Sequence, residues 1–170
     1  MKWRISLTCL LALLCMSAGA QNIKKHYLAK PQENGILYFV KPMKLFGNSK
    51  ANAVVMDFTY LSGQDDIRIN YSFTQPAIVP LDSIGLKTAG SIITCQTEKL
   101  FIEPGKRSAW SHRYSFMIKK SDAVSAFRPG SSTILVLYSG EKVIEYTPAG
   151  EWRKNTGILQ SIFYLIDNNN

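Results

Sequence analysis

Cys95 and His112 are the two residues whose types most directly suggest catalysis. A cysteine thiolate becomes a nucleophile when an imidazole lies within hydrogen-bond distance, and these residues fall in neighbouring predicted strands. Both also suit a structural role, because Cys95 ends a short run that begins with two isoleucines and His112 shares an alternating face with aromatic residues. The sequence favours the structural role and leaves a cysteine hydrolase as an alternative.

A pair of carboxylates is a second route to hydrolysis. Glycosidases hold two such groups roughly 5 to 9.5 Å apart across a cleft. The acids available for a pair are Asp57, Asp65, Asp66, Glu98 and Glu103. Asp65 and Asp66 suit a turn and Asp57 an outward strand position, so no spacing selects two of the five. A small secreted hydrolase therefore stays an alternative, and a protein without catalytic activity is favoured.

Metal and nucleotide chemistry receive no support from the residue patterns. Catalytic zinc usually has three protein ligands, commonly His with a carboxylate, whereas the only histidines are His26 and His112. The chain has no H-E-x-x-H, C-x-x-C, Walker or G-x-G-x-x-G pattern and no G-x-S-x-G elbow. The sequence therefore predicts neither a metal nor another cofactor.

Two tryptophans are candidates for ligand stacking. Trp110 follows a predicted loop and Trp152 lies in a glycine-flanked stretch, so both fall where loops meet regular structure. A flat aromatic ring with a polar atom can stack on a sugar or a peptide, and the chain contains eight tyrosines that could line such a groove. Packing in the core is the competing interpretation of both tryptophans.

The first twenty residues have the pattern of a cleaved signal peptide. Lys2 and Arg4 precede a largely apolar run, and small residues follow at positions 18–20, which predicts a mature start at Gln21. We therefore expect an exported protein, periplasmic or extracellular, with no membrane span after cleavage; an uncleaved anchor is the competing interpretation. Export leaves Cys95 as the single cysteine, so no internal disulfide is expected. About 150 mature residues fit one domain, 21–170.

Positive charge is concentrated at the start of the predicted mature chain. The full chain carries a net charge of +8, and residues 21–50 contain six lysines against Glu33. The candidate binding residues in this lysine-rich N-terminal arm (about 21–50) are Lys24, Lys25, Lys30, Lys41 and Lys44. Outside the cytoplasm such an arm could meet an anionic glycan, a lipid surface or an envelope protein, whereas nucleic acid is disfavoured.

Strands dominate the remaining pattern. Period-two alternation of apolar and polar residues predicts a hairpin from residues 54–61 and 67–73, and a second hairpin ends in residues 110–118. A third is expected from residues 134–138, as a central strand, and 142–146. Shorter strands are expected at 36–40, closed by Lys41 and Pro42, at 77–81 as an edge strand, and at 92–95 and 100–103 as two strands or one bent strand.

Two helices complete the predicted elements. Ser121 followed by Asp122 fits the start of a short helix that ends before Pro129. Near the C-terminus, apolar residues fall on one stripe at helical spacing, with Gly157 near the start of the helix: Ile158, Leu159, Ile162, Phe163 and Ile166. The predicted fold is mainly β, an antiparallel sandwich or partly closed barrel with one short helix and a C-terminal amphipathic helix packed on the sheet.

These observations favour a non-catalytic binding or accessory protein of a bacterial envelope. In the most specific form of this hypothesis, the lysine-rich arm docks on an anionic surface or partner. A structural subunit that assembles through an exposed β edge is a further alternative. The sequence predicts no oligomeric state.

Overall fold

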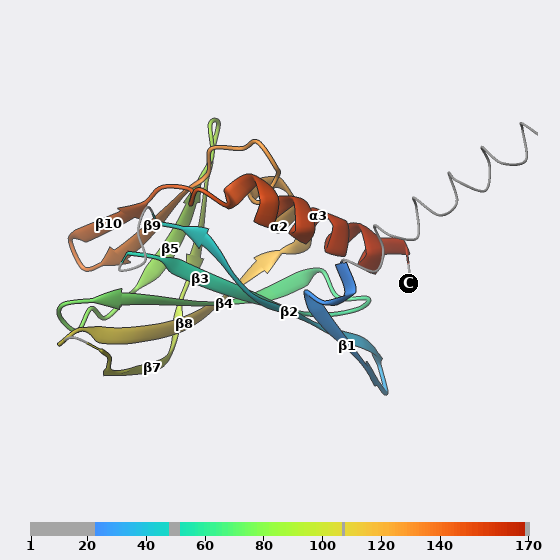
Figure 1. The fold of residues 1–170 in the computed structure, drawn as a ribbon, viewed down its shortest axis with the longest axis horizontal. Coiled ribbons are helices and arrows are strands. Elements are labelled where there is room, and N and C mark those ends of the chain that lie inside the picture. The colour runs from blue at the N-terminus through green and yellow to red at the C-terminus, as the bar shows by residue number, and fades with distance from the viewer. Residues whose placement is uncertain (1–22, 48–51, 107, 169–170) are drawn as a thin grey trace, which may run out of the picture.

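A computed structural model describes residues 23–47, 52–106 and 108–168. The predicted signal peptide and its cleavage site lie outside the described residues. The described chain folds into two antiparallel β-sheets and two helices, and neither sheet closes into a barrel (Figure 1). The predicted mainly β fold is confirmed, in the form of a sandwich.

The larger sheet has six strands in the order β1-β2-β3-β4-β8-β7. Its strands are β1 (Tyr27–Gln32), β2 (Gly35–Phe46), β3 (Val54–Leu61), β4 (Asp66–Gln75), β7 (Glu98–Pro104) and β8 (Trp110–Lys119). Alternation is strict in the centre of this sheet: Met56 and Phe58 of β3 and Ile67 and Ile69 of β4 are buried, whereas the residues between them are not. The predicted β3–β4 and β7–β8 hairpins are both confirmed.

The smaller sheet has four strands in the order β10-β9-β5-β6. Its strands are β5 (Ser83–Lys87), β6 (Ile92–Gln96), β9 (Ile134–Ser139) and β10 (Lys142–Tyr146). The third predicted hairpin is β9–β10, and β9 is central as expected. β5 was not predicted, because Gly85 interrupts a run of only five residues. For residues 92–103 the sequence left open two strands or one bent strand, and the structure has two strands. Thr97 separates β6 from β7, and the chain passes there from the smaller sheet to the larger one.

Pro42 does not end β2, contrary to the prediction. The strand continues to Phe46, and its register against β3 shifts between Val40 and Met43. Proline has no N–H to donate to a neighbouring strand, and at a register shift the strand needs no donor at that position. The pairing of β2 with β1 ends at Val40, so the rest of β2 extends past β1.

The predicted edge strand at residues 77–81 is wrong. This segment crosses the sandwich as irregular chain, and side chains of β8 replace the missing ladder. The N–H of Val79 donates to Nε2 of His112 at 2.9 Å, and the N–H of Leu81 donates to the hydroxyl of Tyr114 at 3.1 Å. Pro80 has no N–H to satisfy, so these two side-chain acceptors serve both backbone donors of residues 79–81.

Both helices begin earlier than predicted. Helix α2 (Lys120–Ala126) follows β8 directly, so Ser121 is not its N-cap. The first N–H groups of a helix have no acceptor within the helix. Here the N–H of Lys120 donates to the carbonyl of Asp65 at 2.7 Å, which does the work of a capping side chain. Helix α3 (Trp152–Asn168) begins five residues before Gly157.

The stripe of α3 covers the core, as expected. Leu159, Ile162, Phe163 and Ile166 are buried, and Ile158 is partly buried against the same cluster. The ring of Phe163 meets that of Phe58 edge to face at 6.2 Å, which places the helix over the inner face of β2 and β3 (Figure 1).

Candidate functional site

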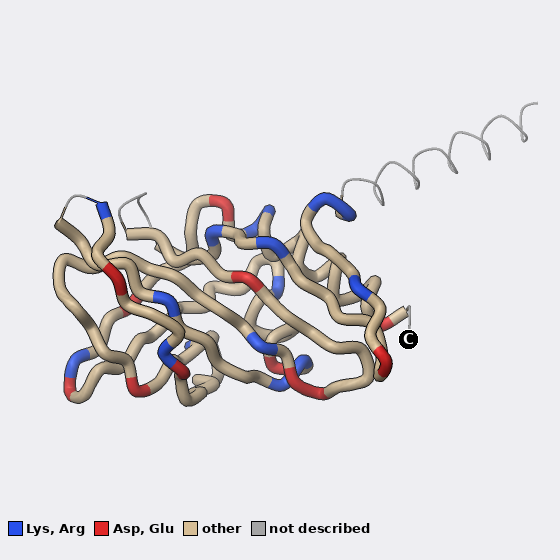
Figure 2. The backbone as a smooth tube through the Cα atoms, turned by 90° about the horizontal axis from the view of Figure 1, so that it is seen from below, with Lys and Arg blue, Asp and Glu red and all other residues tan. Residues whose placement is uncertain are grey.

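Most of the described residues of the predicted N-terminal arm belong to strands β1 and β2 of the larger sheet. β1 and β2 pair as a hairpin from Tyr27 and Val40 to Gln32 and Gly35, and β1 is an edge strand. Four of the five candidate lysines are exposed, Lys24, Lys25, Lys30 and Lys41, and Lys44 is half-buried. Figure 2 shows the first described residues in blue, directly after the grey N-terminal trace. The basic residues therefore sit on an ordered surface.

Three lysines from three parts of the chain act electrostatically on His26. The carbonyl of His26 accepts a hydrogen bond from the N–H of Lys41 at 2.8 Å, which continues the β1–β2 pairing by one step. Burial lowers the pKa of His26 below 6.5, and the positive charges of Lys25, Lys41 and Lys154 lower it further. These four residues form what we call the basic cluster.

Lys154 was not predicted as part of this site. It lies in the first turns of α3, and the neighbouring Asn155 anchors that end of the helix by donating from Nδ2 to the carbonyl of Lys44 at 2.7 Å. That bond reaches the part of β2 that extends past β1. No local sequence signal could have indicated it, because more than a hundred residues separate the two partners.

The basic cluster has no acidic partner within the described part of the chain. The ion pairs found there join Arg68 to Glu98, Arg113 to Asp57, Lys119 to Asp66 and Lys120 to Asp167. None of them includes Lys25, Lys41 or Lys154. The charges acting on His26 are likewise all positive. The lysines of the cluster thus form no ion pair among the described residues, and an external anion would be attracted to them.

The two tryptophans are placed differently from one another. Trp152 is only 5% exposed, and its ring packs against Phe46 at 5.1 Å and Phe127 at 6.1 Å. A ligand cannot stack on a ring that is already enclosed, so the predicted platform at Trp152 is wrong. Trp110 is half-buried at the start of β8, opposite Gln75 and Pro104, and its role as a platform stays a prediction.

Both ring nitrogens of His112 form hydrogen bonds with backbone groups. Because the N–H of Val79 donates to Nε2, the ring proton lies on Nδ1, which donates to the carbonyl of Trp110 at 3.1 Å. The side chain is fully buried, and burial lowers its pKa below 6.5. Both nitrogens are used, so the imidazole has no free position from which to take a proton from Cys95.

Cys95 lacks the environment of a nucleophilic thiol. Burial, and secondarily the negative charge of Asp122, raise its pKa above 9.0. A reactive cysteine needs the opposite, a positive neighbour that stabilises the thiolate. Together with the fixed hydrogen bonds of His112, this removes the physical basis of the cysteine hydrolase.

The acids considered for a glycosidase pair are mostly held by cations. Asp57 accepts from Nη2 of Arg113 at 2.7 Å and from Nδ2 of Asn70 at 2.8 Å. Glu98 pairs with Arg68, and Asp66 pairs with Lys119. Each of these three carboxylates already has a cationic side chain of the same chain as its partner. Stabilisation of the fold therefore accounts for their placement.

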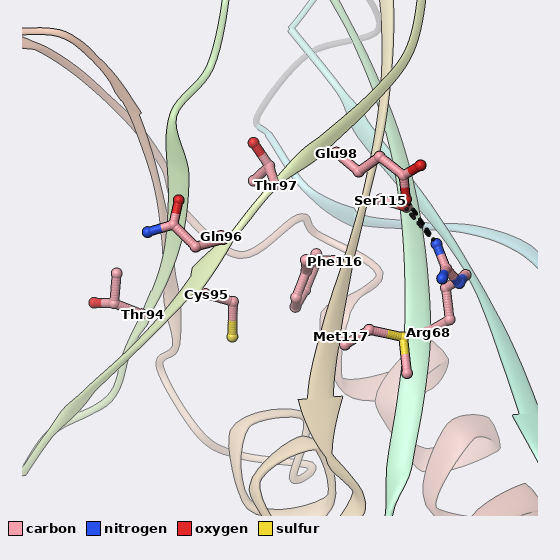
Figure 3. A pocket seen from close by; sticks show the side chains of 9 residues that line it. All are labelled: Arg68, Thr94, Cys95, Gln96, Thr97, Glu98, Ser115, Phe116 and Met117. Atoms are coloured by element: carbon pink, nitrogen blue, oxygen red, sulfur yellow. Dashed lines mark hydrogen bonds and ion pairs between the residues drawn. The ribbon is translucent and has the colours of Figure 1, made fainter.

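A pocket of about 440 Å³ opens where β6 and β7 part from each other beside β8 (Figure 3). Nη1 of Arg68 lies 3.0 Å from Glu98 and 3.1 Å from the hydroxyl of Ser115, so the charges lining the pocket neutralise each other. Cys95 lies on the opposite, β6 side. The pocket thus contains neither an activated nucleophile nor an uncompensated charge.

Within residues 23–47, 52–106 and 108–168, no three His, Cys, Asp or Glu residues lie close enough together to hold a metal ion. Across the same ranges, no helix has the length and apolar character needed to cross a membrane.

Fold and site define an open antiparallel β-sandwich with a terminal helix and a basic cluster at one edge of the larger sheet. Comparisons of the chain with protein-family models, curated proteins and solved structures give no match.

Proposed function

We propose that this chain is a non-catalytic binding module of a bacterial envelope, exported by its N-terminal leader and docking through the basic cluster on an anionic partner. One observation supports this above all others. Lys25, Lys41 and Lys154, from the segment before β1, from β2 and from α3, act together on His26 with no acid among them.

Assembling like charges from separate elements is unfavourable for folding unless something compensates it. Surface lysines are usually interspersed with acids, as Lys119 is with Asp66 at 3.0 Å. The basic cluster departs from that arrangement. An anion that bound there would relieve the repulsion, so the site favours a negatively charged partner.

The surroundings of the candidate nucleophile and of two candidate acids support the proposal that the protein has no catalytic activity. The pKa of Cys95 is raised, His112 is bound at both nitrogens, and Asp57 and Glu98 are each paired with an arginine. Structural stabilisation explains all of these arrangements.

Binding to immobilised heparin, a soluble polyanion, tests the proposal. The triple variant Lys25→Glu, Lys41→Glu, Lys154→Glu should elute at clearly lower salt than the wild type. The matched control is Lys87→Glu, Lys99→Glu, Lys142→Glu, which changes the net charge equally at exposed positions outside the cluster. Equal shifts in the two variants would mean that net charge alone decides binding, and the proposed site would be abandoned.

Assembly through a β edge stays a second prediction. β1 and β7 are the edges of the larger sheet, and β10 and β6 those of the smaller sheet. Light scattering of the purified protein separates this alternative from docking, because edge assembly predicts a mass above that of one chain in the absence of any anion.

A further inference from the structure

Two large apolar side chains lie side by side on the exposed surface of the β1–β2 hairpin. Leu28 of β1 is 59% exposed and Phe39 of β2 is 39% exposed, and they are direct partners in the antiparallel register. Neither contributes to the core on the other face of the hairpin, where Tyr38 and Val40 are buried. The fold therefore gives no structural reason for two exposed apolar residues at this place.

The lysines of the hairpin border this apolar pair. Side chains two residues apart in a strand share a face, so Lys30 lies beside Leu28, and Lys41 lies beside Phe39. Leu37, opposite Lys30, is half-buried and extends the apolar area along β2 toward the turn of the hairpin. These five residues, which we call the hairpin patch, combine an apolar centre with a basic border.

The opposite edge of the same sheet provides an internal comparison. Leu100 and Phe101 of β7 are also exposed, by 43% and 41%. Their flanking charges are mixed, because Glu98 and Lys99 precede them and Glu103 follows them. Exposed apolar residues thus occur at both edges, but only at β1 and β2 are they bordered by lysines with no acid at the alternating positions of the same face.

We propose that the hairpin patch docks on the surface of an anionic lipid bilayer. Leu28 and Phe39 enter the interfacial layer, while Lys30 and Lys41 contact phosphate head groups. This inference rests on the proposed function, since it identifies the anionic partner. A glycan would satisfy the lysines but offers no apolar phase for the exposed pair. A bilayer supplies both, and binding of this kind grows with buried apolar area as well as with charge attraction.

Co-sedimentation with lipid vesicles tests the inference. The chain is used as the cell processes it, with its N-terminus established by mass spectrometry, and the vesicles contain phosphatidylcholine alone or mixed with phosphatidylglycerol. We expect binding to the anionic vesicles, part of which resists high salt. The variant Leu28→Ser, Phe39→Ser should bind about tenfold more weakly and lose the salt-resistant part. The matched control Leu100→Ser, Phe101→Ser should bind as the wild type does.

The outcomes separate this inference from the proposed function. Equal binding by both serine variants, abolished by high salt, would overturn membrane docking and leave electrostatic docking in place. Binding to heparin without binding to anionic vesicles would overturn membrane docking and indicate an acidic glycan or protein. Failure to bind either probe would overturn both proposals.

Discussion

The N–H of Val79 donates a hydrogen bond of 2.9 Å to Nε2 of the buried His112. Two residues along β8, Tyr114 makes the corresponding contacts, accepting from the N–H of Leu81 and donating to the carbonyl of Val79, each at 3.1 Å. Two alternate side chains of β8 therefore supply the hydrogen-bond partners of residues 79–81, which pair with no strand. The residue that first suggested catalysis is part of the link between the two sheets.

We expect the free energy of unfolding to fall as the pH drops from about 7 to about 5. The pKa of His112 lies below 6.5 in the fold, so the unfolded chain takes up a proton that the folded chain resists. Protonation therefore favours the unfolded state, by up to about 2 kcal/mol for one group over this range. Urea denaturation at both pH values measures it. His112→Gln should reduce the difference.

His26→Gln is the control for that measurement, because the pKa of His26 is lowered as well but the residue is not fully buried. In the His26→Gln variant, the part of the pH dependence that comes from His112 should remain. An unchanged pH dependence in His112→Gln would show that the imidazole does not stay neutral in the fold.

Asp57→Ala should destabilise the protein by about 1 to 3 kcal/mol. The substitution leaves Arg113, whose side chain is 28% exposed, without its carboxylate partner, and it also removes the acceptor of Asn70. Asp66→Ala is the matched control, since its pair with Lys119 is open to solvent, and we expect a change under about 1 kcal/mol. Thermal denaturation compares the two, and equal losses would contradict the difference in burial.

Trp152→Ala should cost about 3 to 5 kcal/mol, because it opens a cavity between Phe46, Phe127 and the start of α3. Tyr164→Ala, at a side chain 69% exposed on the same helix, should change stability by less than about 0.5 kcal/mol. Denaturant titration measures both. A stable Trp152→Ala variant would return this tryptophan to the list of ligand-binding candidates.

Iodoacetamide should label Cys95 in the folded protein more slowly than in the unfolded chain. Burial raises the pKa of the thiol, which lowers the thiolate fraction at neutral pH, and the side chain is only partly accessible. Mass spectrometry of quenched samples gives both rates. Faster labelling in the fold would restore the cysteine hydrolase as a hypothesis.

Elements whose signal is local could be read from the sequence. β3 and β4 were predicted because one face of each is buried and the other is not, and this difference appears directly as period-two alternation. The same holds for the stripe of α3 at helical spacing. Turn residues between β9 and β10 then fixed their pairing, because a short connection leaves an antiparallel hairpin as the simplest arrangement.

The partners that only folding brings together could not be read in this way. Residues 77–81 have the composition of an edge strand, and it was the side chains of His112 and Tyr114, more than thirty residues away, that held them outside the sheets. Lys154 joined the basic cluster because Asn155 binds β2, and no periodicity encodes that contact. The amino-acid sequence determined the mainly β class, the amphipathic faces and the excess of lysine near its start. The tertiary structure decided which of those lysines meet and which histidine is buried, because long-range contacts leave no regular spacing along the chain.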